Sequence, residues 1–405
     1  MRLGDICNIG SGGTPSRKKL EFYGGNIPWA KISDIENAQN GILTATEESI
    51  TEEGLNDIRN KLFPVGTLLF AMYGSIGKVA ITGRKMATNQ AILGITPKDK
   101  DIISLDYLKI WFEANKQQLL NQGRGVTLKN LSATIIRDLD VPIPAYQTQL
   151  HIANILTKAE SLIAQRKESL RLHDEYLKSV FLEMFGDPVR NEKKYRIVEI
   201  SEISTHIKDG PHVSPKYSEN GIPILSTRNI RPGKLIMDEL KYVSEQTYTE
   251  LTKRFKPQKF DVLITKGGTT GYAKVVDFDF EFCIWVHLAC VRLKSTVNPF
   301  YFEHAFNSDY CYFQARKFTH GITNQDLGLT RIAKIKLLLP PIELQTKFAK
   351  IVEKTEALKT QYQQSLQVLE NLYGSLSQKA FKGELDLKDE SLLMAAEPEI
   401  TYNKK

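Results

Sequence analysis

The sequence has little of what builds metal and redox centres. Its four cysteines form no C-x-x-C pair and have no histidines at zinc-finger spacing. We therefore expect reduced, mostly buried thiols and neither a metal site nor a disulfide framework. An apolar run of about 20 residues, which a membrane span requires, is also missing, and the charged start "MRLGDICNIG" does not resemble a secretion signal. These absences predict a cytoplasmic protein with no role for a membrane.

The signatures of three enzyme classes are missing as well. "LPPIEL" (339–344) lacks the polar first residue of the [DN]-P-P-[FYW] motif of adenine methyltransferases. "GSIGKV" (74–79) is too short for a phosphate-binding loop and lacks its closing hydroxyl. A nuclease arrangement is represented only by the proximity of Asp187 to residues 192–194 at a domain junction. The sequence thus predicts no catalytic site and no bound cofactor.

What is present is an ordinary globular composition with a basic balance. Hydrophobic residues make up 41% and charged residues 25% of the 405 positions, enough for two or three domains with cores of their own. The formal net charge is +7 and the pI is about 8.9. This charge fits a polyanionic partner such as nucleic acid without demonstrating one.

One junction between a proline-rich segment and a helix occurs twice in the sequence. "PIPAYQTQLHIANIL" (142–156) returns as "LPPIELQTKFAKIV" (339–352), which places Gln149 and Gln345 196 residues apart. The same offset pairs Leu170 with Leu366, and offsets of 194 to 197 pair glycines nearer the start of each half. A period this long exceeds the 20 to 50 residues of solenoid repeats and indicates a duplicated domain pair.

Each half has the same plan, a globular region followed by a long helix. Short β-like runs punctuated by Gly and Pro alternate with one amphipathic helix, expected over 105–120 and again over 300–318. Both globular regions are thus predicted to be α+β domains. The expected boundaries are 1–145 and 187–341 for the globular domains, 146–186 and 342–382 for the long helices, and 383–405 for a flexible tail.

Both long helices carry a nearly heptad apolar seam. The first seam comprises Ile152, Leu156, Ala159, Ile163, Arg166, Leu170, His173, Leu177, Val180 and Met184. The second comprises Phe348, Val352, Thr355, Lys359, Tyr362, Leu366, Leu369, Tyr373, Leu376 and Ala380. Each stripe is too long for one small domain to cover. The simplest arrangement pairs the two helices as an antiparallel coiled coil about a pseudo-twofold axis.

These features together resemble the specificity subunit of type I restriction-modification systems. Two globular regions alternate with two long helices, and "FLEMFGDP" (181–188) and "QKAFKGEL" (378–385) close the helices. The resemblance covers residues 1–385 and implies two target-recognition domains that each read half of a bipartite DNA site. It implies helices that act as a ruler and as the docking surface for partners, and a subunit that catalyses nothing itself.

The resemblance also implies the partners. They are double-stranded DNA, two copies of a methyltransferase subunit and, in a system that restricts DNA, two restriction-translocase subunits. S-adenosylmethionine, ATP and Mg²⁺ are expected in those partner chains and not in this one. A helix of about 35 residues spans roughly 50 Å, comparable with or somewhat above one turn of B-DNA. Because the two regions share landmarks but differ in most residues, we expect an asymmetric target.

Loops that recur in both halves with different side chains are the candidate DNA contacts. They are "YGSIGK" (73–78) with "KGGTTGY" (266–272), "WAKISDI" (29–35) with "ILSTRNI" (224–230), and "GRGVT" (123–127) with "THGIT" (319–323), joined by "DGPH" (209–212). Glycines allow a close backbone approach to phosphate, and Arg228 and Asn229 have the chemistry to read guanine and adenine. The candidates are Lys31, Ser33, Tyr73, Ser75, Lys78, Arg124, Thr127, Lys208, His212, Thr227, Arg228, Asn229, Lys266, Thr269, Thr270, Tyr272, His320 and Thr323.

Structural explanations of these patterns stay open. Tight turns between strands, solvated surface loops and helix C-terminal glycine turns give the same residues. His287, in the strand-like run "FCIWVHLACVRL" (282–293), is expected to be structural. A duplicated protein-interaction scaffold is the alternative function for the whole chain, and a stand-alone nuclease or methyltransferase is the less favoured one.

Overall fold

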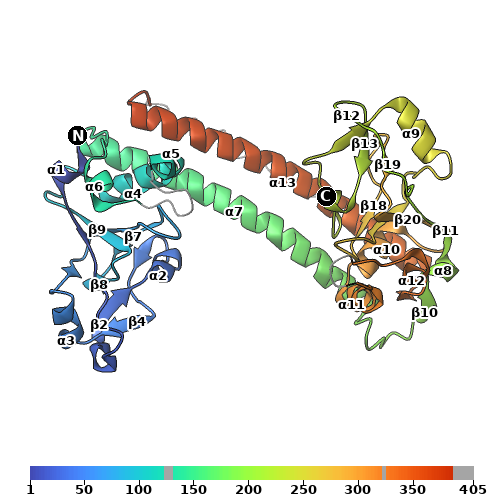
Figure 1. Ribbon diagram of the computed structural model, residues 1–405, viewed down its shortest axis with the longest axis horizontal. Coiled ribbons are helices and arrows are strands. Elements are labelled where there is room, and N and C mark those ends of the chain that lie inside the picture. The colour runs from blue at the N-terminus through green and yellow to red at the C-terminus, as the bar shows by residue number, and fades with distance from the viewer. Residues whose placement is uncertain (123–130, 322–324, 386–405) are drawn as a thin grey trace, which may run out of the picture. The chain divides into compact units, whose positions relative to one another are not determined.

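The computed structural model describes residues 1–122, 131–321 and 325–385. Within them the chain forms two compact units (Figure 1). The first unit comprises residues 1–168 and 363–385, and the second comprises residues 169–362. Each unit therefore contains one globular region together with part of each long helix.

The first unit is built on two sheets. The larger has the order β1-β9-β6-β7-β3, from Cys7–Ser11, Ile92–Pro97, Leu68–Ala71, Val79–Thr82 and Ile42–Leu43. The smaller has the order β4-β2-β8-β5, from Glu48–Ile50, Tyr23–Ala30, Met86–Thr88 and Leu62–Phe63. The central strands β6 and β9 are apolar and buried, as expected for strands packed on both faces.

Helices surround these sheets. They are α1 (Leu3–Ile6), η1 (Leu20–Phe22), α2 (Ile32–Glu36), α3 (Glu52–Asp57), α4 (Leu105–Ala114), α5 (Lys116–Gln122) and α6 (Ala133–Arg137). Thr51, Ser104 and Ser132 are the N-caps of α3, α4 and α6, and each side-chain oxygen accepts a hydrogen bond from a first-turn backbone N–H.

The second unit repeats this plan. One sheet has the order β11-β20-β17-β18, from Ser204–Asp209, Leu288–Leu293, Val262–Thr265 and Ala273–Val275. The other has the order β12-β16-β13-β19, from Tyr217–Ser218, Lys241–Val243, Ile222–Leu225 and Cys283–Ile284. Two antiparallel strand pairs are added. The first joins the distant segments β10 (Arg196–Glu199) and β21 (Lys336–Leu339), and the second is the hairpin of β14 (Ile230–Arg231) with β15 (Lys234–Leu235). Its shorter helices are α8 (Ile200–Ile203), η2 (Thr227–Asn229), α9 (Glu245–Thr252), α10 (Pro299–Phe306), α11 (Asp309–Phe318) and α12 (Leu329–Ile332).

The predicted duplication of two α+β domains is confirmed strand by strand. The order β1-β9-β6-β7 corresponds to β11-β20-β17-β18, and β4-β2-β8 corresponds to β16-β13-β19. A parallel pairing also recurs, between β2 and β8 and between β13 and β19. Most matched elements begin 193 to 197 residues apart, close to the sequence offsets of 194 to 197.

Two local predictions were wrong. The single helices expected over 105–120 and 300–318 are each broken into two, α4 with α5 and α10 with α11, where Asn115 and Asn307 end the first helix. Asparagine favours such ends because its side chain competes for backbone hydrogen bonds. The strand-like run 282–293 is also interrupted, so His287 lies exposed in the turn between β19 and β20.

The duplicated junction anchors the start of each long helix, α7 (Tyr146–Phe185) and α13 (Ile342–Lys382). The buried amide of Gln149 accepts a hydrogen bond from Ser104 N at 2.9 Å and donates to the carbonyls of Ile102 and Pro144, both at 2.9 Å. Gln345 does the same with Asn298 N at 2.8 Å and with the carbonyls of Thr296 and Pro340 at 3.3 and 2.8 Å. Each glutamine thus fixes its long helix to the loop before α4 or α10.

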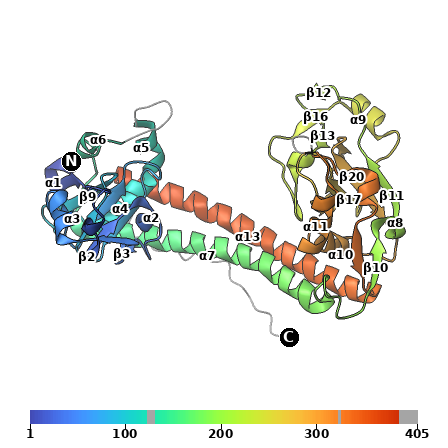
Figure 2. The same ribbon diagram turned by 60° about the horizontal axis from the view of Figure 1, so that its bottom comes forward.

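The predicted antiparallel pairing of the long helices is present within each unit (Figures 1 and 2). In the first unit the start of α7 packs on the end of α13, where Tyr373 donates to Glu160 at 2.6 Å and Lys167 pairs with Glu370 at 2.8 Å. In the second unit the end of α7 packs on the start of α13, where Lys359 pairs with Asp174 at 2.7 Å. Every predicted seam residue is buried or half-buried.

Each hydrophobic core is closed by both long helices. In the first unit, Tyr107 of α4 meets Phe381 at the end of α13, with ring centroids 5.7 Å apart. In the second unit, Tyr301 of α10 meets Phe185 at the end of α7, at 4.7 Å. The two contacts join matched residues, so each globular region packs on the beginning of the helix that follows it and on the end of the other helix.

Candidate nucleic-acid interface

In the second unit, three of the predicted loops meet at Lys266. Its ammonium lies 3.1 Å from the carboxylate of Asp209 and 3.8 Å from that of Asp326. His212, exposed, lies 3.3 Å from the same Asp209. The hydroxyls of Thr270 and Thr319 are 2.9 Å apart. Loop 209–212, turn 266–272 and the segment that begins at Thr319 therefore form one surface.

Lys266 has a structural role at this surface. Its side chain is only 8% exposed, and its backbone is bonded to His287 O at 2.9 Å and to Leu327 N at 2.7 Å. In the first unit Met72 occupies the matched place, with bonds to Ala91 O at 2.9 Å and Leu131 N at 3.5 Å. Both copies thus use the backbone of this position to join neighbouring segments. The Lys266 ammonium is buried and paired with Asp209 and Asp326, so it cannot contact DNA without opening these ion pairs.

The glycine turns are the same turn in both copies. Gly74 and Gly268 have φ of 61° and 71°, and Gly77 and Gly271 have φ of 80° and 89°, a region that favours glycine. The tight-turn explanation is therefore correct for the backbone, while the side chains differ in exposure. Tyr73, Lys78 and Thr269 are exposed, Ser75 and Tyr272 are half-buried, and Thr270 is buried. Ser75 donates to Glu36 of α2, and Tyr272 stacks on Tyr312.

Asn229 has a structural role, because it completes the capping box of η2 with the N-cap Ser226. Its Oδ1 accepts a hydrogen bond from Ser226 N at 2.9 Å, and its Nδ2 donates to Ile236 O at 3.1 Å, while 4% of the residue is exposed. In the first unit Asp34 holds the matched place, and its Oδ2 accepts from Lys31 N at 2.7 Å. Because this hydrogen bond to the backbone occurs in both copies, Asn229 serves the scaffold. Its neighbour Arg228 is exposed and remains a predicted DNA contact.

The remaining predicted residues fall into three groups. Lys208 and His320 are exposed, and Ser33 and Thr227 are half-buried. Lys31 is half-buried between two carboxylates, at 3.0 Å from each. Arg124, Thr127 and Thr323 lie outside the described residues. All of these stay predictions, and the exposed ones are the side chains that a duplex could reach without rearrangement.

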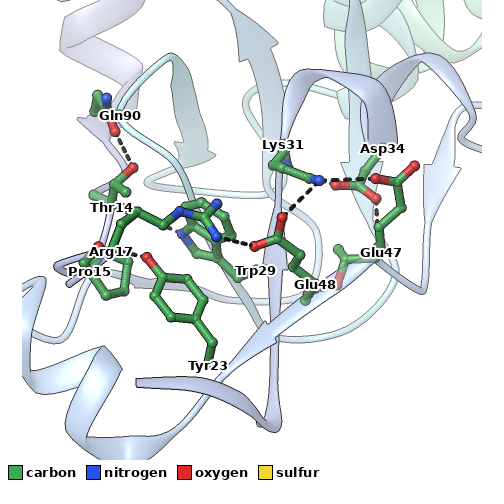
Figure 3. Close-up of polar contacts among 12 residues, drawn as sticks. Thr14, Pro15, Arg17, Tyr23, Trp29, Lys31, Asp34, Glu47, Glu48 and Gln90 are labelled. Atoms are coloured by element: carbon green, nitrogen blue, oxygen red, sulfur yellow. Dashed lines mark hydrogen bonds and ion pairs between the residues drawn. The ribbon is translucent and has the colours of Figure 1, made fainter. Parts of the chain in front are cut away.

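The sequence reasoning missed one group of side chains in the first unit. Arg17, in the loop after β1, lies 2.8 Å from Glu48 of β4 and packs over the rings of Tyr23 and Trp29 (Figure 3). The sequence signal was available: "SRKK" (16–19) places three cations in a row after a glycine-rich strand end. Its partners Tyr23, Trp29 and Glu48 become neighbours only once β2 pairs with β4.

The thiols of the chain are not activated for chemistry. The four cysteines are buried and free, and burial raises the pKa of Cys7 to about 11 and of Cys283 to about 12, so their thiols are held in the unreactive neutral form. Residues 1–122, 131–321 and 325–385 contain no group of three or more His, Cys, Asp or Glu side chains placed to hold a metal ion. None of the described helices is long and apolar enough to cross a bilayer.

Comparison with known proteins matches both halves of the chain. The family described as "Type I restriction modification DNA specificity domain" matches residues 1–172 and again 190–371. The type I restriction enzyme MjaIX specificity subunit of Methanocaldococcus jannaschii is 24% identical over 413 residues, which covers 96% of this chain and 93% of the relative. The EcoKI specificity subunit of Escherichia coli K12 is 24% identical over 384 residues, covering 86% and 81%.

Solved structures have the same fold. The S subunit of a type I restriction-modification system from M. genitalium matches with a TM-score of 0.58 at 13% identity, over 94% of this chain and 95% of that one. A chain solved in work on complex assembly and conformational transition of the type I R-M system matches with a TM-score of 0.53 at 18% identity, over 95% and 97%. The chain therefore belongs to the type I restriction-modification DNA specificity family and is a specificity subunit, the non-catalytic DNA-recognition component of such a system.

Proposed function

We propose that this subunit directs adenine methylation to an asymmetric, gapped DNA site, with one half-site read by each globular domain. The observation that carries the proposal is one fold built twice with different side chains at matched loop positions. Loop 73–78 carries Tyr73 and Lys78 where turn 266–272 carries Gly267 and Tyr272, and Lys31 stands where the second copy has Ser226. Two copies of one scaffold with different chemistry suit two different short sequences.

The proposed partners follow from the same duplication. Because the junctions and helix seams occur twice, the chain offers two equivalent docking places, which suits two copies of one methyltransferase subunit. Two restriction-translocase subunits join in a system that also cleaves DNA. S-adenosylmethionine, ATP and Mg²⁺ act in those partner chains in this proposal, as the family resemblance implies. A subunit working on chromosomal DNA would act in the cytoplasm.

The test is a genome-wide map of methylated adenines in the native host, with and without the gene. We expect the deletion to remove one asymmetric gapped motif and to leave other methylation unchanged. Binding of duplex DNA by the purified complex should fall steeply with salt, because phosphate contacts release counterions. An unchanged map, together with salt-insensitive or absent DNA binding, would contradict the proposal and favour the protein-interaction scaffold.

A further inference from the structure

Four charged side chains form a continuous row on the first unit. The Arg17 guanidinium pairs with Glu48 at 2.8 Å, Glu48 also pairs with the Lys31 ammonium at 3.0 Å, and Lys31 pairs with Glu47 at 3.0 Å. Figure 3 shows these groups side by side, with the bonded pair Thr14 and Gln90 continuing the row beyond Arg17. The row thus alternates hydrogen-bond donors with acceptors.

The row is held in place by aromatic side chains beneath it. The Arg17 guanidinium lies 4.5 Å from the ring centroid of Tyr23 and 5.0 Å from that of Trp29. Tyr23 donates its hydroxyl to Pro15 O at 2.6 Å, and Trp29 donates its indole N–H to Gly13 O at 2.9 Å. These bonds tie the loop that carries Arg17 to strand β2, so the guanidinium is already ordered before any ligand arrives.

The row faces solvent although its members are ordered. The side chains of Arg17 and Glu47 are 55% and 57% exposed, whereas those of Lys31 and Glu48 are 27% and 31% exposed. Exposed ion pairs contribute at most about 1 kcal/mol to stability. Exchanging a partner inside the row for a group on a ligand would therefore cost little.

The chemistry of the row suits base edges better than phosphates. A phosphate-binding patch gains from unopposed cations, and two carboxylates among the cations would repel a phosphate group. In the major groove, guanine presents two acceptors that a guanidinium binds with two hydrogen bonds, and cytosine presents an amino donor that a carboxylate accepts. Lys18 and Lys19 follow Arg17 directly and are exposed, so they are placed to contact phosphates next to the row.

The second copy of the fold lacks this row. Trp29 and Ile224 are matched positions of the two copies. Trp29 pairs with Glu48 and Ile224 pairs with Lys241, so Lys241 occupies the position that Glu48 has in the first copy. Ser226 matches Lys31, and Ser214 matches Arg17. Lys241 lies instead over the ring of Tyr217, at 4.4 Å. A feature that the shared scaffold requires would recur in both copies, as the junction glutamines do. The row does not recur, so its role is specific to the first domain.

We infer that Arg17 and Glu48 read base edges in the half-site bound by the first domain, Arg17 as donor to a guanine and Glu48 as acceptor from an amino group of the adjoining base pair. This inference rests on the proposed function. Lys31 and Glu47 extend the row and keep the two readers charged and oriented. The two half-sites differ in part because Lys241 and the two serines replace this row in the second domain.

The experiment uses the full-length subunit assembled with its methyltransferase partners, in a host that lacks the native gene. R17A should lower discrimination at one base position of one half-site by about 5- to 150-fold, the range expected for one bidentate contact. E48Q, which keeps the shape of the side chain, should relax the adjoining position. The other half-site should stay as in the wild type for both variants. The readout is the methylated-adenine motif.

The control removes a similar ion pair elsewhere. R196A breaks the exposed pair of Arg196 with Glu202 in the second unit, 2.6 Å apart, and should leave both half-sites unchanged. Thermal melting checks that each variant is folded. If R17A is unfolded, E48Q carries the test, because an amide in place of the carboxylate preserves packing while it removes the charged acceptor.

Several outcomes would overturn the inference. An unchanged motif in a folded R17A or E48Q complex would leave the row as solvated surface ion pairs. Equal weakening on all sequences, with the slope of log affinity against log salt reduced by about one, would make Arg17 a phosphate contact. Failure of the proposed function looks different, because the wild-type subunit would then produce no gapped motif at all.

Discussion

The side-chain amides of Gln149 and Gln345 make the same three hydrogen bonds in the two copies of the fold. In both places the amide oxygen accepts from a backbone N–H before α4 or α10, and the amide nitrogen donates to two carbonyls. Both residues are fully buried. The duplicated junction therefore exists because each long helix must leave its domain in a fixed direction.

Replacing Gln149 with alanine should destabilise the first unit. Three backbone groups would lose a buried partner, and each unsatisfied group costs about 1 to 3 kcal/mol, so we expect a total loss of roughly 2 to 5 kcal/mol after relaxation. Urea unfolding measures this loss. Q147A, at an exposed position two residues earlier, is the control and should change the free energy of unfolding by less than about 0.5 kcal/mol. Equal effects of the two substitutions would contradict the anchoring role.

Glu303 should give the second unit an unusual pH dependence. It is 4% exposed, and burial raises its pKa to about 7, against an opposing effect of the Lys274 ammonium. The folded state thus binds an extra proton between pH 4.5 and 7. The stability that this proton brings is complete below pH 4.5 and is lost as the pH rises through 7. His304 acts with the opposite sign over an overlapping range, because burial lowers its pKa from 6.5 to about 4 and stability is therefore lost as the pH falls from 6.5 towards 4.

Comparison with E303Q isolates the contribution of Glu303. The free energy of unfolding of E303Q relative to wild type should rise by roughly 2 to 3 kcal/mol between pH 4.5 and pH 7, since glutamine carries no charge at either pH. Hydrogen exchange at the slowest amides of β17 and β20 reports the opening of this unit. E353Q, at an exposed position on α13, is the control. A constant difference across this pH range would show that Glu303 is charged in the folded chain.

Arg228 and Asn229 should respond differently to alanine despite being neighbours. N229A removes the side chain that completes the capping box of η2 with Ser226 and should cost about 1 to 2 kcal/mol of stability. R228A removes an exposed side chain, so the fold should keep its stability while affinity for the cognate duplex falls. Thermal melting and duplex titration separate the two effects. A base contact by Asn229 would instead appear as altered sequence preference in a variant that melts like the wild type.

Exchanging residues 1–145 for the equivalent region of a relative should change one half-site and leave the other intact. The reason is that the strands and loops proposed to contact DNA in each domain come from one continuous stretch of sequence. The measurement is the methylated-adenine motif of the hybrid. A change of both half-sites would contradict modular reading.

Inserting seven residues near Leu170 and seven near Leu366 should lengthen the gap between the half-sites. Seven residues preserve the heptad seam and add about 10 Å of helix, equivalent to about three base pairs. Both half-sites should be unchanged. An active, folded variant with the original gap would show that the length of the helices does not set the distance between the half-sites.

Sequence reasoning succeeded where the signal is local or repeated. The offset of 196 residues and the apolar seams predicted the duplication and the helix pairing, because periodicity survives without knowledge of tertiary contacts. Folding gives two of the predicted site residues structural partners that the chemistry of their side chains alone does not reveal. Asn229 has the chemistry of an adenine reader, but folding places its amide against Ser226 and Ile236. Lys266 resembles a phosphate ligand, but Asp209, 57 positions earlier in the sequence, neutralises it in the folded chain.

The contact of Tyr107 with Phe381 has a consequence for the order of folding. The first domain leaves the ribosome long before the segment that closes its core, which includes Leu376, Ala380 and Phe381. Until α13 is complete, the nascent first domain exposes apolar surface, a state prone to aggregation and to chaperone binding. A late nonsense mutation in α13 would therefore damage the domain that was synthesised first, several hundred residues away in the chain.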